Sequence, residues 1–136
     1  MVLKVYTDGG SRGNPGPAAI GVAFYIGVEP IFTYREDIGI ATNNDAEYTA
    51  LIRALEKIKE QREKIKDAEK IEVRSDSSLI INQVRGFFKV KQGKIKEYIF
   101  KIRTLEQEIG LPVSYHLIPR EENRVADALV KNKEII

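Results

Sequence analysis

The chain has 136 residues, the size of one domain with a single core, and 43% of them are hydrophobic and 31% charged. It contains no cysteine, which excludes disulfides and thiolate metal sites and leaves oxygen ligands for any metal. No apolar run is long enough to span a membrane and no signal-peptide pattern opens the chain, so we expect one monomeric, cytoplasmic domain over residues 1–136.

The segment from Leu3 to Gly16 alternates like a strand up to Asp8 and then becomes a glycine-rich loop. Asp8 is therefore predicted to be the last fixed side chain before a backbone that can approach a ligand closely. Gly9 and Gly10 follow it directly. A carboxylate at such a strand end suits a metal ligand, and the alternative is an ordinary Asp-Gly turn that closes a hairpin.

Two further strands are predicted at 18–27 and 31–40. Cap-forming residues from Thr42 to Glu47 then lead into a long helix with an apolar stripe at 3.6-residue spacing. Glu47 lies four residues before Leu51 of that stripe, so it falls on the buried side of the helix. A carboxylate there needs a balancing charge, unless it is a first-turn Glu that only favours the helix dipole.

A fourth strand is predicted from Ile71 to Ser75, and Asp76 stands where it stops, before a short helix from Ser77. Asp76 is either the N-cap of that helix or a second carboxylate at a strand end. The fifth strand is predicted at 111–118. It contains the only histidine of the chain, which we expect to be a packing or edge residue rather than a base (His116).

The last helix is predicted to open at Pro119 and to turn Ala126 and Leu129 inward. Asp127 falls at the edge of this inward arc. A carboxylate at the rim of a buried face can reach a cleft, although a surface Asp is the commoner explanation.

The positive charge is concentrated between Arg85 and Arg103, where seven basic residues stand against one acidic residue, Glu97. Aromatic residues are interleaved with them, as in nucleic-acid-binding surfaces. The alternative is a solvated helix face. We expect four lysines around Gly93 to follow a phosphate backbone: Lys89, Lys91, Lys94 and Lys96.

The order of elements predicts an α/β fold in which strands one, four and five are parallel neighbours. Asp8 and Asp76 would then face one crevice, with Glu47 and Asp127 at the starts of two helices beside it. Clustered carboxylates repel one another unless cations join them, so the site calls for Mg²⁺ or Mn²⁺.

These segments resemble ribonuclease H of type 1 over essentially the whole chain. The matching motifs are Tyr6-Thr-Asp-Gly-Gly-Ser-Arg-Gly-Asn-Pro-Gly16, Thr42-Asn-Asn-Asp-Ala-Glu47, Ser75-Asp-Ser77 and Asn123-Arg-Val-Ala-Asp127. The resemblance implies a five-stranded mixed sheet, with strands 1–3 antiparallel, 4 and 5 parallel to 1, and helices on both faces. It also implies a hydrolase that cuts the RNA strand of RNA–DNA hybrids with two Mg²⁺ ions, or Mn²⁺ as a substitute, and leaves 5′-phosphate and 3′-hydroxyl ends. The implied ligands of the two ions are Asp8, Glu47, Asp76 and Asp127.

The same resemblance assigns nucleic-acid contacts in the minor groove, where the 2′-hydroxyl distinguishes RNA from DNA. Asn14 and Asn43 match groove-contacting positions, beside Gly9 and Gly10, and Thr42 matches a residue that grips a phosphate of the DNA strand. Ser78 stands where the family has a groove-contacting Gln.

Three departures from the family pattern bear on function. Ile40 replaces a phosphate-gripping Arg, which together with Ser78 could let double-stranded RNA be cut. The loop before the last helix lacks its usual His, and Arg120 is the candidate to replace it. The extra basic helix of some members is absent. The first rival function is a binding module that does not cut, and the four acids argue against it because binding needs none. The second is a DNA-cutting or strand-transfer enzyme on the same fold, and the glycine-asparagine loop argues against that.

Overall fold

A computed structural model describes residues 1–86, 90 and 93–132 of the chain. No helix among these residues is long and apolar enough to cross a membrane. The elements, in chain order, are β1 Val2–Ser11, β2 Gly16–Ile26, β3 Glu29–Ala41, α1 Asn43–Glu60, the 3₁₀ helix η1 Arg62–Ile65, β4 Lys70–Ser75, α2 Ser78–Val84, α3 Gly93–Ile109, β5 Val113–Leu117, the 3₁₀ helix η2 Arg120–Glu122 and α4 Arg124–Lys131.

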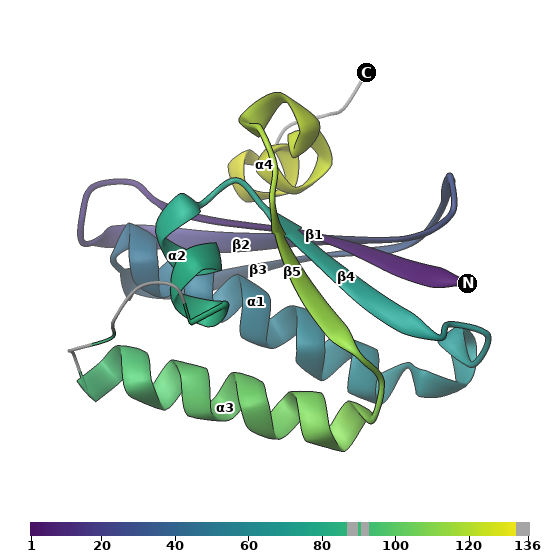
Figure 1. Ribbon diagram of the computed structural model, residues 1–136. Helices are drawn as coiled ribbons and strands as arrows, with labels where there is room; N and C mark the ends of the chain where they lie inside the picture. The colour runs from purple at the N-terminus through teal and green to yellow at the C-terminus, as the bar shows by residue number, and fades with distance from the viewer. Residues whose placement is uncertain (87–89, 91–92, 133–136) are drawn as a thin grey trace.

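The five strands form one mixed sheet in the order β3-β2-β1-β4-β5 (Figure 1). β1, β2 and β3 are successively antiparallel, whereas β4 is parallel to β1 and β5 is parallel to β4. The predicted α/β fold and strand directions are confirmed. Because β1 is the central strand, its alternating side chains face two different layers of the molecule.

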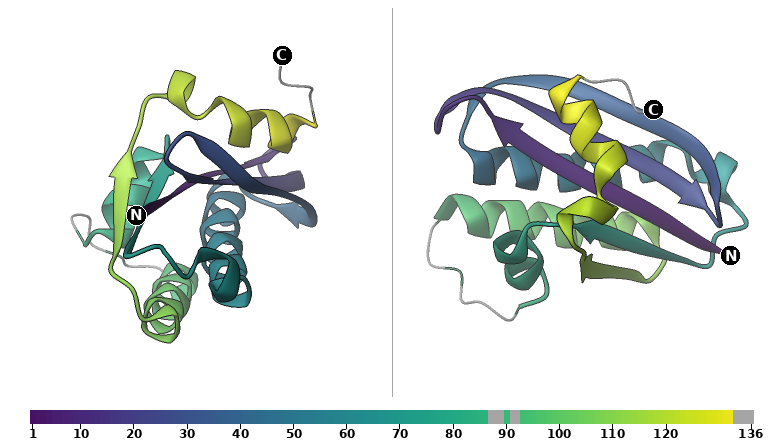
Figure 2. Two further views of the ribbon diagram at one scale, coloured as in Figure 1. Left: turned by 90° about the vertical axis from the view of Figure 1, so that its right-hand side faces the viewer. Right: turned by 90° about the horizontal axis from the view of Figure 1, so that it is seen from above.

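Helices cover both faces of this sheet: α1 and then α3 lie on one side, and α4 lies on the other (Figures 1 and 2). The main core joins β1 to α1 through fully buried side chains such as Leu3, Val5, Leu51 and Leu55. Burying one such side chain contributes about 2 kcal/mol relative to leaving it in water. This packing fixes the first helix against the central strand, and so fixes the carboxylates that each element carries.

Two glycines let the helices approach the sheet closely. A Cβ built on Gly9 would lie 2.3 Å from the carbonyl oxygen of Ala46 in α1, and one built on Gly21 would lie 2.5 Å from that of Ala126 in α4. Gly21 is the partner of Asp8 across β1 and β2. Both helix backbones therefore reach the sheet beside Asp8, from opposite faces.

The first strand is longer than its sequence predicts. β1 does not end at Asp8 but continues to Ser11, which pairs with Ala18 of β2. Both expectations for this stretch, a strand end at Asp8 and an Asp-Gly hairpin turn, are therefore wrong. The glycines after Asp8 carry no side chains, and their backbones remain in the ladder opposite β2.

Candidate active site

Three carboxylates meet where β1 and β4 diverge. The last pair of these parallel strands is Tyr6 with Arg74. Asp8 and Asp76 each stand two residues beyond it and share one gap, while Glu47 enters the gap from α1. One oxygen atom from each of the three lies within 4.8 Å of the others. We call Asp8, Glu47 and Asp76 the carboxylate cluster.

Glu47 is held at this position by the backbone of β1. The amide of Gly9 donates a hydrogen bond of 2.5 Å to Oε1 of Glu47. The bond is possible because Gly9 has no side chain to separate β1 from α1. The first glycine after Asp8 thus has a structural role here, and its contact with nucleic acid stays a prediction.

The electrostatics of the carboxylate cluster favour a bound cation. Burial and, next, the negative charge of Asp76 raise the pKa of Asp8 to about 7. Burial and the charge of Asp8 raise the pKa of Glu47 well above its usual range. An anionic oxygen cage of this kind suits a hard divalent ion such as Mg²⁺, which carboxylates bind.

The side chain of Asp76 can join the carboxylate cluster because Ser77, and not Asp76, caps α2. The Ser77 side chain accepts the hydrogen bond from the amide of Ile80 at 3.4 Å. The N-cap interpretation of Asp76 is therefore wrong. The cation closest to Asp76 among the described residues is Arg120, whose Nε lies 3.9 Å from Oδ2. Arg120 is 84% exposed, so this contact leaves the guanidinium accessible.

Asp127 lines the same cleft from the other face of the sheet. It lies in α4, which begins at Arg124 after the short 3₁₀ helix rather than at Pro119. Its charge also contributes to the raised pKa of Asp8, after the larger effects of burial and Asp76. Lys131 pairs with Asp127 at 3.1 Å. The structure thus brings oxygen atoms of three predicted ligands within 4.8 Å of one another and places the fourth, Asp127, in a cleft that Asp8 and Asp76 also line.

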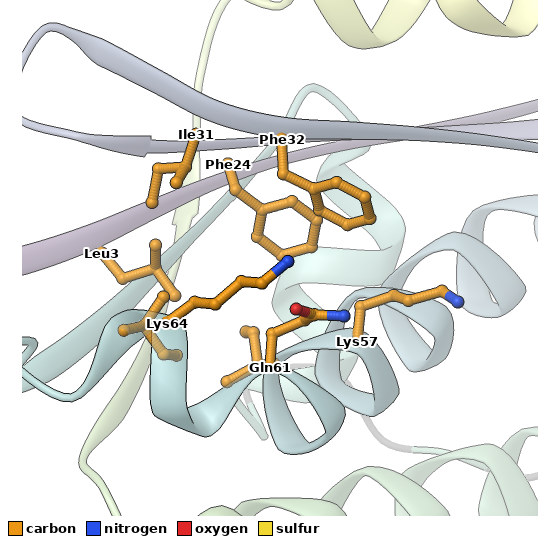
Figure 3. Close-up of a pocket in the computed structure, with 9 residues that line it drawn as sticks. Leu3, Phe24, Ile31, Phe32, Lys57, Gln61 and Lys64 are labelled. Carbon is orange, nitrogen blue, oxygen red and sulfur yellow. The ribbon is translucent and has the colours of Figure 1, made fainter.

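These acids open into a cleft of about 620 Å³ on the α4 side of the sheet. A separate, apolar pocket of about 80 Å³ opens at the opposite end of α1 (Figure 3). Leu3, Phe24 and Phe32 line it, together with Lys57 and Lys64. No described residue of this second pocket is a carboxylate, so the chemistry of the first cleft has no counterpart there.

The glycine loop is tied to the start of α1 by side-chain amides. Oδ1 of Asn43 accepts from the amide of Ser11 at 2.9 Å, and Oδ1 of Asn14 accepts from the amide of Asn43 at 2.9 Å. Thr42 caps α1 by accepting from the amide of Asp45 at 3.1 Å. Both Asn side chains therefore use their oxygens internally, and each keeps an exposed NH₂ group as a donor.

The segment from Arg85 to Arg103 is here called the basic segment, and three of its described cations, Lys94, Lys101 and Arg103, form ion pairs. Nζ of Lys94 lies 3.0 Å from Oδ2 of Asp45. Oδ1 of the same carboxylate accepts from the Tyr98 hydroxyl at 2.9 Å. Lys94 is therefore paired within the protein, and its contact with a phosphate backbone stays a prediction. Lys96 is exposed at the start of α3. Lys89 and Lys91 lie outside the described residues.

Two further residues singled out in the sequence, Ser78 and His116, lie in different parts of the structure. Ser78 is exposed at the first turn of α2, where its carbonyl and hydroxyl oxygens accept from Nδ2 of Asn82 at 2.8 and 3.2 Å. His116 lies on the edge strand β5, where its Nε2 is 2.8 Å from Oγ of Ser114. It lines a different pocket from the carboxylates, as its interpretation as an edge residue predicts.

Arg12 and Asp45 are charged residues of this region that the sequence interpretation passed over. Arg12 lines the cleft beside the acids, and Asp45 connects α1 to α3. Arg12 could have been found, because it lies within the glycine loop itself. Asp45 could not, because its partner Lys94 is 49 residues away in the chain.

Comparison with known proteins gives consistent matches. A family model described as reverse transcriptase-like matches residues 7–133. Ribonuclease HI of Halobacterium salinarum is 40% identical over 129 residues, which cover 93% of this chain and 61% of that protein. The chain covers 35% of the bifunctional protein Rv2228c of Mycobacterium tuberculosis, so it spans less than two thirds of either relative.

Solved structures match over nearly the full length. LC11-RNase H1, isolated from compost by a metagenomic approach, was solved in complex with an RNA/DNA hybrid. It is 44% identical, with a TM-score of 0.89 over 96% of this chain and 95% of that one. The N-terminal RNase H domain of the mycobacterial protein is 31% identical, with a TM-score of 0.85 over 98% of both chains.

Proposed function

Because the chain belongs to the reverse transcriptase-like family and, within it, to the type 1 ribonucleases H, we propose that it is an endoribonuclease that hydrolyses the RNA strand of RNA–DNA hybrids. The observation that carries the proposal is the carboxylate cluster, with oxygen atoms from three elements within 4.8 Å of one another. A similar protein in complex with an RNA/DNA hybrid supports the substrate class.

The acids of the cleft would hold two Mg²⁺ ions, with Mn²⁺ as a substitute. Asp8 is central, because its charge interacts with those of Glu47, Asp76 and Asp127 alike. When bound, such ions lower the pKa of an attacking water and stabilise negative charge on the leaving oxygen. Cleavage that leaves a 5′-phosphate and a 3′-hydroxyl is the expected outcome.

Recognition of the duplex would use the loop and helix start beside the cluster. The exposed NH₂ groups of Asn14 and Asn43 can donate to groove acceptors such as base edges and 2′-hydroxyls. The hydroxyl of Thr42 lies at the N-terminus of α1, where backbone amides and the helix dipole favour a phosphate. Such contacts would hold the scissile strand over the acids.

Arg120 is the candidate to draw the product phosphate away from the acids. It lies in η2, lines the cleft and is highly exposed, with its Nε 3.9 Å from Asp76. A guanidinium binds phosphate oxygens in a bidentate manner and stays charged at every working pH. His116 lacks this position, since it lines another pocket.

Cleavage of double-stranded RNA is a second activity that one observation favours. Ile40 is 71% exposed on β3, two residues before Thr42, and offers an apolar surface where the family has a phosphate-gripping Arg. Selectivity for a DNA strand at this position would then be weaker.

The test is to incubate the protein with Mg²⁺ or Mn²⁺ and labelled RNA–DNA hybrid, double-stranded RNA and double-stranded DNA side by side. We expect the RNA of the hybrid to be cut, with 5′-phosphate ends on the products. Binding of the hybrid without cutting in either metal would identify a binding module instead. Cutting of double-stranded DNA would identify a DNA nuclease on the same fold.

A further inference from the structure

The cleft that holds the acids continues beyond them, over β1, β2 and β3. Its floor there consists of small residues such as Gly10, Ala18 and Ala19, and one wall is formed by Val130 and Lys131 of α4. Seen from above, α4 lies across the strands on this side of the sheet (Figure 2). The predicted nucleic-acid contacts on α1, α2 and α3 come from helices of the opposite face, so Gly10 is the predicted contact that lines this extension.

Four of the described cations line the cleft, and they differ in how they are paired. Arg35, Lys131 and Arg120 line it together with Arg12. Arg35 is engaged within the protein, because its Nε donates to the carbonyl oxygen of Leu129 at 2.7 Å and its Nη1 lies 2.9 Å from Asp37. Lys131 and Arg120 are each paired with an acid of the site.

Arg12 differs from these three cations. Among the residues that the structure describes, its guanidinium has no ion pair within 4 Å and no hydrogen bond, and the residue is exposed. Its backbone is nevertheless fixed, since its amide donates to the carbonyl oxygen of Pro17 at 2.8 Å. The side chain is therefore available at a defined position beside the cleft.

Arg12 comes directly after the last residue of β1 and lines the same cleft as Asp8. Ser11 contacts Asn43 on the α1 side, and Gly9 faces α1 as well. Asp8 and Gly10 therefore face the α4 side, where Arg12 lines the same cleft. Four residues of extended chain correspond to roughly 13 Å, and the long side chain of Arg12 can span part of that distance toward Asp8.

We infer that Arg12 binds a non-scissile phosphate of the cleaved strand, within a few nucleotides of the cut. A strand that places one phosphate over the acids must carry its next phosphates past them, because a duplex has one per roughly 3.4 Å of axis on each strand. A guanidinium meets a phosphate with two parallel hydrogen bonds. The small side chains of the floor leave room for the backbone. This role rests on the proposed function, since it requires a nucleic-acid strand in the cleft.

The competing explanation is that Arg12 only offsets the charge of Asp37. Arg12 does contribute to the lowered pKa of Asp37, but the hydrogen bond and charge of Arg35 are the larger causes. Asp37 therefore already has its partner. Under this explanation, removal of Arg12 leaves the affinity for nucleic acid unchanged.

The test measures hybrid binding in Ca²⁺ by fluorescence anisotropy across a salt series for wild type, Arg12→Gln and Arg12→Lys. We expect Arg12→Gln to bind about tenfold more weakly at low salt and to lose about 0.9 from the slope of log affinity against log salt. Arg12→Lys should recover the slope. Lys64→Gln is the matched control, because Lys64 is a cation at the opposite end of α1 and should bind like wild type.

A second series uses hybrids in which one RNA-strand phosphate at a time, up to three on either side of the cut, is a neutral methylphosphonate. At one position of the neutral phosphate, wild type should bind the modified hybrid more weakly than the unmodified one, whereas Arg12→Gln should bind both equally well. Equal sensitivity of both proteins at every position would overturn the assignment, as would unchanged binding by Arg12→Gln or no binding of hybrid by wild type. The proposed function is judged separately, from cleavage by wild type in Mg²⁺.

Discussion

The carboxylate cluster and the basic segment treat charge in opposite ways. In the cluster, three like charges converge, and the closest described cation is Arg120 at 3.9 Å. In the basic segment, Lys94 and Arg103 each have an acidic partner at 2.9–3.0 Å, and Lys101 has one at 3.7 Å. Opposite charges are thus paired in the basic segment, whereas like charges lie close together in the carboxylate cluster, where they repel one another.

This difference shows which charges are available for function. A surplus of Lys and Arg along the chain does not measure free positive charge, because acids of α1 and of the same helix pair with several of these residues. Uncompensated carboxylates are costly to bury, and they persist when a ligand supplies the missing charge. The acids therefore indicate function more directly than the lysines do.

The strongest test of the acidic side of this comparison is Asp8→Asn. We expect cleavage to fall by roughly a thousandfold, which corresponds to about 4 kcal/mol of lost transition-state stabilisation from a displaced metal ion. Single-turnover cleavage of labelled hybrid in Mg²⁺ measures the effect. Asp67→Asn, in an exposed loop, is the matched control and should cleave like wild type. Cleavage by Asp8→Asn within tenfold of wild type would remove Asp8 from the metal site.

Arg120, the described cation closest to Asp76, provides the next test. Arg120→Ala should lower multiple-turnover cleavage by about tenfold, since an exposed guanidinium that binds phosphate at this position assists product release. The control is His116→Ala, which should retain wild-type turnover because His116 lines another pocket. If His116→Ala lost turnover and Arg120→Ala did not, the two assignments would be reversed.

The same comparison shows what the sequence could and could not predict. Periodicity was sufficient for the sheet and for Glu47, because the apolar stripe of α1 fixes which side of the helix is buried. It could not decide between Asp76 and Ser77 as the cap of α2, because both residue types cap helices well. It also ended β1 at Asp8, because glycine residues are unfavourable within a strand. In the structure, pairing with β2 nevertheless continues through these glycines to Ser11.

Long-range pairs were beyond reach of sequence pattern. Asp45 looks like an ordinary first-turn acid of a helix, and Lys94 like one of several surface lysines. Only the packing of α3 against α1, with Tyr98 stacked on Tyr48 at 5.0 Å, brings the two charges together. A charge count along one segment cannot contain that information.

The repulsion in the carboxylate cluster should also appear in stability. The pKa of Asp8 is raised from 3.8 to about 7 by burial and then by Asp76, so the folded state retains a proton that the unfolded state has lost between these values. Stability of the metal-free protein must therefore fall as pH rises from 4 to 7. Asp8→Asn lacks this titrating group, so its Tm should exceed that of wild type by several degrees at pH 8.

Thermal unfolding in EDTA at pH 4.5, 6 and 8 measures this difference. Mg²⁺ should raise the Tm of wild type at pH 8, because an ion that binds only the folded state stabilises it. Asp67→Asn again serves as control and should follow wild type. A wild-type Tm that rises between pH 5 and 7 in EDTA would mean that positively charged groups of the protein already compensate the negative charge of the acids.

The smallest effect comes from the basic segment, where the structure separates two neighbouring lysines. Lys96 is exposed, and no described residue forms an ion pair with it, whereas Lys94 lies 3.0 Å from Asp45. If Lys96 neutralises a phosphate, Lys96→Gln should lower the slope of log affinity against log salt by about 0.9. The double variant Asp45→Asn with Lys94→Gln removes both members of the internal pair and should leave that slope unchanged, since neither charge then contacts the duplex. Hybrid binding across a salt series in Ca²⁺ compares the two, with Tm measured to confirm that the double variant is folded. A flattened slope in the double variant alone would contradict this assignment. It would mean that Lys94 leaves Asp45 when nucleic acid binds, so that its charge becomes available to a phosphate of the duplex.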